Sequence, residues 1–126
     1  MPTILVVDDS QTMRDNVKEL LLKEGFDVVE AESGEQGLEM MGLHKVNLII
    51  SDLNMPGMDG LTMCGHIKQQ GYNVPIFMLT TQANPELKIK AKDYGVLAWM
   101  VKPYKADALT QGIRKVLGMR IGTSTE

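Results

Sequence analysis

The chain has 126 residues, a formal net charge of -3 and a single cysteine. This length suffices for one domain with a buried core, and one cysteine excludes both a disulfide framework and a zinc site built from several cysteines. No apolar run approaches the roughly 20 residues of a membrane span, and the first residues lack a signal-peptide pattern, so we expect a cytoplasmic protein without a membrane anchor.

The first half of the chain alternates short apolar runs with helical patterns. A strand is predicted at 3–8, followed by a helix in which apolar residues recur at helical spacing over 13–21. Strands at 27–31 and 46–51 come next, and Ser33 stands between them where a helix N-cap belongs. This succession predicts two strand-helix-strand units.

The second half continues the pattern. Asp59 is better explained as the N-cap of the next helix than as a metal ligand, and a strand follows at 74–80. The residues after it alternate with period two, which alone would indicate an exposed strand, but an Asn-Pro start signal favours a weak helix over 85–94. A strand at 96–101 and an amphipathic helix around 109–117 complete the series.

Strands that are apolar throughout and separated by helices indicate a parallel sheet that is covered on both faces. We therefore predict an α/β fold, a doubly wound five-stranded parallel sheet with five helices. It occupies one domain at 1–118, followed by a short polar tail at 119–126.

Acidic residues follow two of the predicted strands, at the edge where doubly wound sheets bind their ligands. Asp8, Asp9 and Asp52 lie at such strand ends, as does Thr80. Two like charges about 4 Å apart repel each other by roughly 4 kcal/mol at an effective dielectric constant near 20. A divalent cation such as Mg2+, which prefers oxygen ligands, would offset this repulsion, and Lys102 after the last strand adds a positive charge.

Four segments at matching spacings carry a family resemblance: VVDDS, SDLNMPGMDG, MLTT and VKPY. Together they resemble the receiver domain of two-component response regulators, and most of all the stand-alone chemotaxis regulators of the CheY type. The resemblance covers residues 3–117 and implies a flavodoxin-like (CheY-like) strand order 2-1-3-4-5. Taken alone, Asp8 and Asp9 fit a helix cap as well as a metal site; the four motifs together favour the metal site.

The resemblance also implies roles for individual residues. Asp52 is the phospho-accepting nucleophile, and Lys102 and Thr80 stabilise the transferred group. A metal ion and a lysine suit this reaction because the phosphoryl group in transfer spreads negative charge over its oxygens. The implied ligands of Mg2+ (or Mn2+) are Asp9, Asp52, the backbone carbonyl of Asn54 and, through a water molecule, Asp8. The bond between Lys102 and Pro103 is expected to be cis.

Thr80 and Trp99 form the implied conformational switch. In the family, phosphorylation draws the threonine toward the phosphate, and an aromatic side chain, usually Tyr or Phe, enters the vacated space. An indole is larger than a phenol ring, so fixed packing of Trp99 is the alternative. Thr81 replaces the small residue commonest at its position and is expected to slow hydrolysis of the acyl phosphate, and Gln82 is placed to influence the attacking water.

The charge is divided unevenly along the chain. Residues 1–82 carry 5 basic and 12 acidic side chains, whereas residues 83–126 carry 8 and 4. Basic side chains of the last two helices belong to the implied output face, and they favour an acidic partner; a merely solvated basic face is the alternative. The face comprises Lys88, Lys90, Lys92, Trp99 and Lys105, with Arg114 and Lys115 on the last helix.

These features predict a single-domain response regulator that takes a phosphoryl group from a histidine kinase and signals through its output face, in chemotaxis and flagellar motor control. Its target would be a flagellar switch protein with an acidic segment. The first alternative is a relay that passes phosphate to a histidine phosphotransfer protein. We expect a monomer that binds no nucleic acid.

The second alternative is a phosphatase that works through an aspartyl phosphate. It is disfavoured because Asn54 stands where such an enzyme needs a second acid, and because no insertion is long enough for a cap. We therefore expect a signalling protein that catalyses only its own phosphorylation and dephosphorylation. A flavin-binding module of the same topology is disfavoured because the carboxylates would repel the phosphate of FMN.

Overall fold

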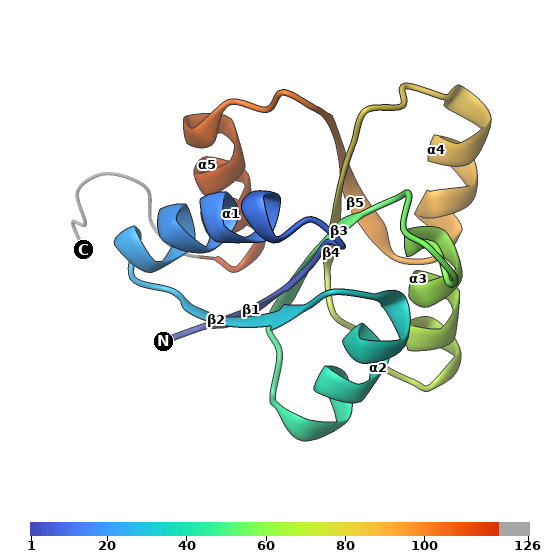
Figure 1. The fold of residues 1–126 in the computed structure, drawn as a ribbon, viewed down its shortest axis with the longest axis horizontal. Helices are drawn as coiled ribbons and strands as arrows, with labels where there is room; N and C mark the ends of the chain where they lie inside the picture. The colour runs from blue at the N-terminus through green and yellow to red at the C-terminus, as the bar shows by residue number, and fades with distance from the viewer. Residues whose placement is uncertain (119–126) are drawn as a thin grey trace.

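A parallel sheet with helices on both faces makes up residues 1–118, the part of the chain that this computed structural model describes (Figure 1). Its strands are β1 (Thr3–Val7), β2 (Asp27–Ala31), β3 (Leu48–Asp52), β4 (Ile76–Thr80) and β5 (Val96–Val101). Its helices are α1 (Gln11–Lys23), α2 (Gly34–Leu43), α3 (Gly60–Gln69), α4 (Pro85–Asp93) and α5 (Ala106–Val116). The strands pair in the order β2-β1-β3-β4-β5, so the predicted doubly wound fold and strand order are confirmed. The predicted tail at 119–126 lies outside the described residues.

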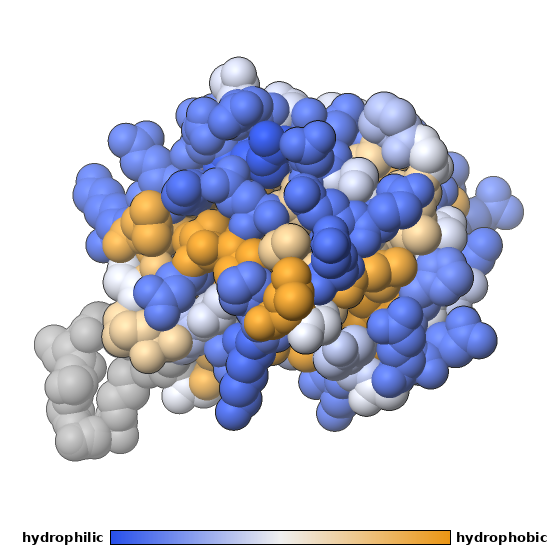
Figure 2. Space-filling model, turned by 60° about the horizontal axis from the view of Figure 1, so that its bottom comes forward, coloured by the Kyte–Doolittle hydropathy of each residue, from blue (hydrophilic) through white to orange (hydrophobic). Residues whose placement is uncertain are grey.

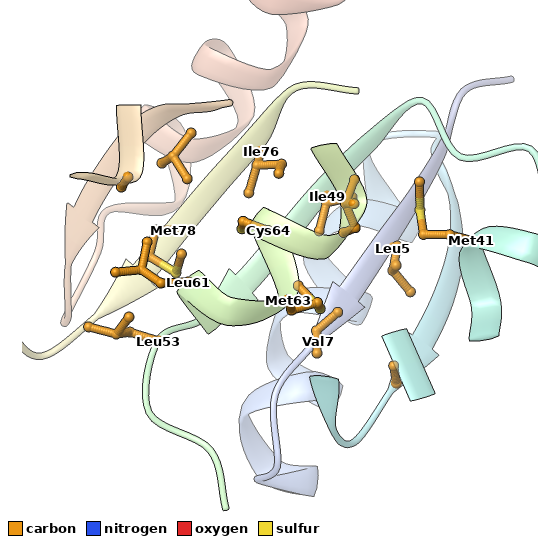
Figure 3. Packing of buried hydrophobic residues seen from close by; sticks show 14 of the residues in the cluster. Leu5, Val7, Met41, Ile49, Leu53, Leu61, Met63, Cys64, Ile76 and Met78 are labelled. Atoms are coloured by element: carbon orange, nitrogen blue, oxygen red, sulfur yellow. The ribbon is translucent and has the colours of Figure 1, made fainter. Parts of the chain in front are cut away.

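Alternate residues of the strands supply two separate cores. Leu5 and Val7 of β1 belong to a core that also contains side chains of α2, α3 and α4, whereas Ile4 and Val6 belong to a core that also contains side chains of α1 and α5. Figure 3 shows the first of these cores, where Met63 on α3 lies against the sheet near Val7. The central strands are therefore buried on both faces, which is why their sequences are continuously apolar.

The turn after β3 depends on two glycines for different physical reasons. Gly57 has a φ of +77°, a conformation that favours glycine. Gly60 begins α3 and donates its N–H to the carbonyl of Leu53 at 2.8 Å. A Cβ atom at Gly60 would lie only 2.2 Å from the carbonyl oxygen of Asp52. The side chain of Asp59 accepts the N–H of Thr62 at 2.7 Å, which confirms it as the cap of α3.

Helix α4 forms where the sequence alternates with period two. The Asn84 side chain accepts the N–H groups of Glu86 and Leu87 at 2.9 and 3.2 Å, and Pro85 occupies the first turn. Ala91 is the one residue of α4 that is buried. The predicted helix is thus confirmed, and its low intrinsic stability stays a prediction.

The face shown in Figure 2 is mainly hydrophilic and is broken by a few apolar patches. Exposed apolar residues include Ile89 on α4 and Leu97 and Val101 on β5. Within residues 1–118, none of the helices combines the length and the apolar character needed to cross a membrane.

Candidate functional site

Three carboxylates meet at the carboxyl-terminal edge of the sheet. Asp8 and Asp9 follow β1, and Asp52 ends β3, the strand beside β1. One oxygen from each carboxylate lies within 4.8 Å of the others. Asp8 is buried, Asp52 is partly buried and Asp9 is exposed, so the cluster is reachable from solvent through Asp9.

Lys102 brings a positive charge to this cluster. Its Nζ lies 3.4 Å from Oδ2 of Asp8 and 3.5 Å from Oδ1 of Asp52. The residue directly follows β5, and its backbone N–H donates to the carbonyl of Thr80 at 2.7 Å, which holds the ends of β4 and β5 together. The peptide bond to Pro103 is cis, as the resemblance implied.

Asp8 is held by the strand ends and by the start of α1. Its backbone N–H donates to the carbonyl of Ala31 at 3.1 Å, and its Oδ1 accepts the N–H of Ser10 at 2.9 Å. The hydroxyl of Ser10 in turn accepts the N–H of Met13, so Ser10 is the N-cap of α1. The alternative in which Asp8 or Asp9 caps this helix is therefore wrong, because Ser10 fills that position.

Burial dominates the electrostatics of Asp52. It raises the pKa of the Asp52 carboxyl above its ordinary value; the nearby Lys102 ammonium opposes this rise and the Asp8 carboxylate adds to it. One ammonium beside three carboxylates leaves an excess of negative charge. A hard divalent cation fits this donor set, because carboxylate oxygens are the ligands that Mg2+ and Mn2+ prefer.

Thr80 and Asn54 reach the same edge of the sheet from different elements. Thr80 ends β4, is fully buried, and accepts the N–H of Gln82 on its side-chain oxygen at 3.1 Å. Asn54 is exposed in the loop directly after β3. The sequence thus placed Asp8, Asp9, Asp52, Thr80 and Lys102 at one edge correctly, while metal binding by the Asn54 carbonyl stays a prediction.

Trp99 on β5 is connected to the loop that follows Thr80. Its indole Nε1–H donates to the carbonyl of Gln82 at 2.9 Å, and its ring packs against the core that contains side chains of α2, α3 and α4. Gln82 therefore contacts Thr80 through its N–H and Trp99 through its carbonyl. This connection could not be predicted, because a backbone acceptor leaves no signal in the sequence. Rotation of Trp99 stays a prediction.

The lysines of the predicted output face are exposed, but their use as an output face stays a prediction, and one assignment is corrected. Lys88, Lys90 and Lys92 are exposed on α4, and Lys105 is exposed at the start of α5. Arg114 does not contribute a free charge to this face. Its guanidinium donates to Oε1 of Glu24 at 3.0 Å and lies over the ring of Phe26, 5.3 Å from the ring centroid.

The fold and the site geometry agree with similarities to known proteins. A family model described as "Response regulator receiver domain" matches residues 4–114. The chemotaxis protein CheY of Bacillus subtilis is 39% identical over 115 residues, which are 90% of this chain and 96% of that protein. The aerobic respiration control protein ArcA of Escherichia coli is 33% identical over 99% of this chain, and the match spans 53% of ArcA.

A solved structure supplies a further comparison. The response regulator TrrA of Thermotoga maritima, in complex with Mg2+ and BeF, has a TM-score of 0.83 and 31% sequence identity. The match covers 92% of this chain and 99% of that one. Strand order, the acidic edge with its lysine and the matching family model agree, and the chain belongs to the response regulator receiver domain family.

Proposed function

We propose that this receiver domain accepts a phosphoryl group on Asp52 from a histidine kinase and then signals to a protein target. The observation that carries the proposal is the environment of Asp52. Its carboxylate lies with those of Asp8 and Asp9 at a solvent-accessible edge, 3.5 Å from the ammonium of Lys102. Mg2+ (or Mn2+), held by Asp9, Asp52 and the carbonyl of Asn54, with Asp8 acting through water, would supply positive charge to the phosphoryl oxygens.

The proposed step is an in-line transfer. A carboxylate oxygen of Asp52 forms a bond to phosphorus while the P–N bond to the kinase histidine breaks, and the imidazole nitrogen keeps the electron pair. Lys102 is suited to neutralise charge on the phosphoryl oxygens, because its ammonium already lies beside the attacking carboxylate. The hydroxyl of Thr80 would donate a hydrogen bond to the acyl phosphate.

The hydrogen bonds of Gln82 support a route from the phosphate to the output face. Thr80 would give up its contact with the N–H of Gln82 when it moves toward the phosphate, and the carbonyl of that residue holds Trp99. We therefore expect phosphorylation to change the surroundings of Trp99 and the population of conformations of α4. The output face so controlled carries Trp99 and the exposed lysines Lys88, Lys90, Lys92 and Lys105.

The relatives support a signalling context for the proposal. Similarity to CheY along 96% of its length supports a role in chemotaxis, with a flagellar switch protein that offers an acidic segment as the target. Relay to a histidine phosphotransfer protein is the second candidate. The match to about half of ArcA, an aerobic respiration control protein, means that the similarity is not limited to chemotaxis proteins. We place the domain in the cytoplasm as a monomer.

The test uses the full chain, acetyl phosphate and Mg2+, with Asp52→Asn as the control. We expect the wild type to gain the mass of one phosphoryl group, to lose this gain in excess chelator, and to change its Trp99 fluorescence. Asp52→Asn should show neither the mass gain nor the change in Trp99 fluorescence. An equal mass gain in Asp52→Asn, or none in the wild type, would refute the proposal. Multiple turnover of a phosphomonoester would favour the phosphatase instead.

A further inference from the structure

Arg14 is a buried cation directly beneath the acidic edge. It lies on α1 with 7% of its surface exposed, and a buried guanidinium requires hydrogen-bond partners. Its Nη1 donates to the backbone carbonyl of Asp8 at 2.6 Å, and its Nε donates to Oε1 of Glu30 on β2 at 3.3 Å. Lys18 donates to the other oxygen of Glu30 at 3.0 Å.

The carbonyl of Asp8 belongs to the peptide plane that joins Asp8 to Asp9. Because a peptide group is planar, fixing that oxygen also fixes the N–H of Asp9 and restricts where the Asp9 carboxylate points. The Asp8 side chain is already held by the N–H of Ser10 and by Lys102. Asp9 is exposed, so its direction depends more strongly on its backbone.

We propose that Arg14 is a positioning residue for the cation site: its guanidinium fixes the Asp8–Asp9 peptide and so holds the two carboxylates at the spacing that binds Mg2+. The inference rests on the Mg2+-dependent function proposed above. Arginine suits this role because its rigid fork reaches the Asp8 carbonyl and Glu30 at the same time. Lysine presents a single ammonium that does not reproduce this fork.

The chain offers a matched control for this role. Arg114, which is partly buried, donates to the carbonyl of Glu24 at 2.9 Å and to its carboxylate at 3.0 Å. It therefore makes the same two kinds of contact, a carbonyl and a carboxylate, on α5 rather than at the acidic edge. Arg14→Lys and Arg114→Lys should both lower the melting temperature, but only the first should change metal binding.

The experiment measures the Mg2+ affinity of the full chain by calorimetry, together with the amide chemical shift of Asp9 in metal-free protein. We expect Arg14→Lys to weaken Mg2+ binding about tenfold, which is the lower end of the losses seen when a group that orients metal ligands is removed. The same variant should change the amide chemical shift of Asp9. Arg114→Lys should keep the Mg2+ affinity of the wild type, since Arg114 does not touch a ligand. Arg14→Gln serves the same test if Arg14→Lys does not fold.

Glu30→Gln separates positioning from the ion pair. It removes the charge of the Glu30 side chain but keeps an oxygen that can accept from Nε of Arg14, so both arms of the fork remain and Mg2+ affinity should be nearly unchanged. Equal weakening in Glu30→Gln and Arg14→Lys would overturn the inference, as would wild-type affinity in Arg14→Lys. In the second case the proposed function would stand; a wild type that binds no Mg2+ would instead refute both.

Discussion

Replacing Gly60 with alanine should damage both the fold and the phosphorylation site. Gly60 begins α3, and a Cβ atom there would meet the carbonyl oxygen of Asp52 at 2.2 Å and the Cα of Leu53 at 3.1 Å. Both obstacles are backbone atoms, so no side-chain rotation relieves the clash. The start of α3 and the end of β3 must move apart, and this movement carries Asp52 with it.

The size of the movement follows from the contact distance. An ordinary Cβ contact is about 3.4 Å or longer, so the 2.2 Å approach to the Asp52 oxygen demands a displacement of about 1 Å. Overpacking of this kind costs about 1–3 kcal/mol of the free energy of unfolding. A misplacement of about 1 Å at a reacting group slows a reaction by roughly a hundredfold, so phosphorylation of Asp52 should slow by a similar factor.

Gly42→Ala is the matched control, because Gly42 lies in α2 with no atom within 4 Å of the added Cβ. It should stabilise the protein by up to about 1 kcal/mol, as alanine does over glycine in a helix. Urea unfolding gives the stability of both variants, and the rate of phosphoryl incorporation from acetyl phosphate gives the activity. Gly60→Ala with wild-type stability and wild-type rate would refute the close approach at Asp52.

Other predictions concern sites away from this turn. Burial raises the pKa of the Cys64 thiol to about 12, so thiol reagents at pH 8 should label it only after unfolding in urea. Asn84→Ala should cost about 1 kcal/mol and speed amide exchange in α4, because it removes the cap of that helix. The hydrogen bond from Lys18, assisted by Arg14, lowers the pKa of Glu30 below 4.5. Glu30 therefore contributes about 1 kcal/mol to the free energy of unfolding above pH 4.5, and this contribution is lost as the pH falls through the lowered pKa. Urea unfolding at decreasing pH should show this loss in the wild type but not in Glu30→Gln.

Each of these predictions has a clear contrary result. Rapid labelling of the native thiol would show that Cys64 is not in the core. Unchanged exchange in α4 with Asn84→Ala would show that the cap does not limit the opening of the helix. A constant difference in the free energy of unfolding between wild type and Glu30→Gln, from neutral to acidic pH, would show that the Glu30 pKa is not lowered.

The sequence predicted the features that depend on local chemistry and on the rules of parallel sheets. The central strands are recognisable because burial on both faces requires continuous apolar runs. The caps Ser33, Asp59 and Asn84 are recognisable because a short polar side chain before a helix accepts its free N–H groups. Asp52 and Lys102 were assigned to one edge because the carboxyl ends of parallel strands coincide.

Features that depend on contacts with distant backbone atoms could not be predicted in this way. The roles of Arg14, Gly60 and Trp99 each depend on one carbonyl oxygen, of Asp8, Asp52 and Gln82 respectively. Every residue has a carbonyl, so the sequence does not show which one is the partner. Arg114 was wrongly assigned to the basic output face because its pairing with Glu24 depends on how α5 packs beside α1, which the sequence does not show.

Chemical trapping of the acyl phosphate tests the central claim most directly. The full chain is phosphorylated with acetyl phosphate and Mg2+, reduced with borohydride, and mapped by tandem mass spectrometry. Borohydride converts a phosphorylated aspartate to homoserine, so we predict homoserine at Asp52, with none when Mg2+ is omitted. Homoserine at Asp8, Asp9 or Asp59 instead, or at no position, would contradict the assignment of Asp52 as the phospho-acceptor.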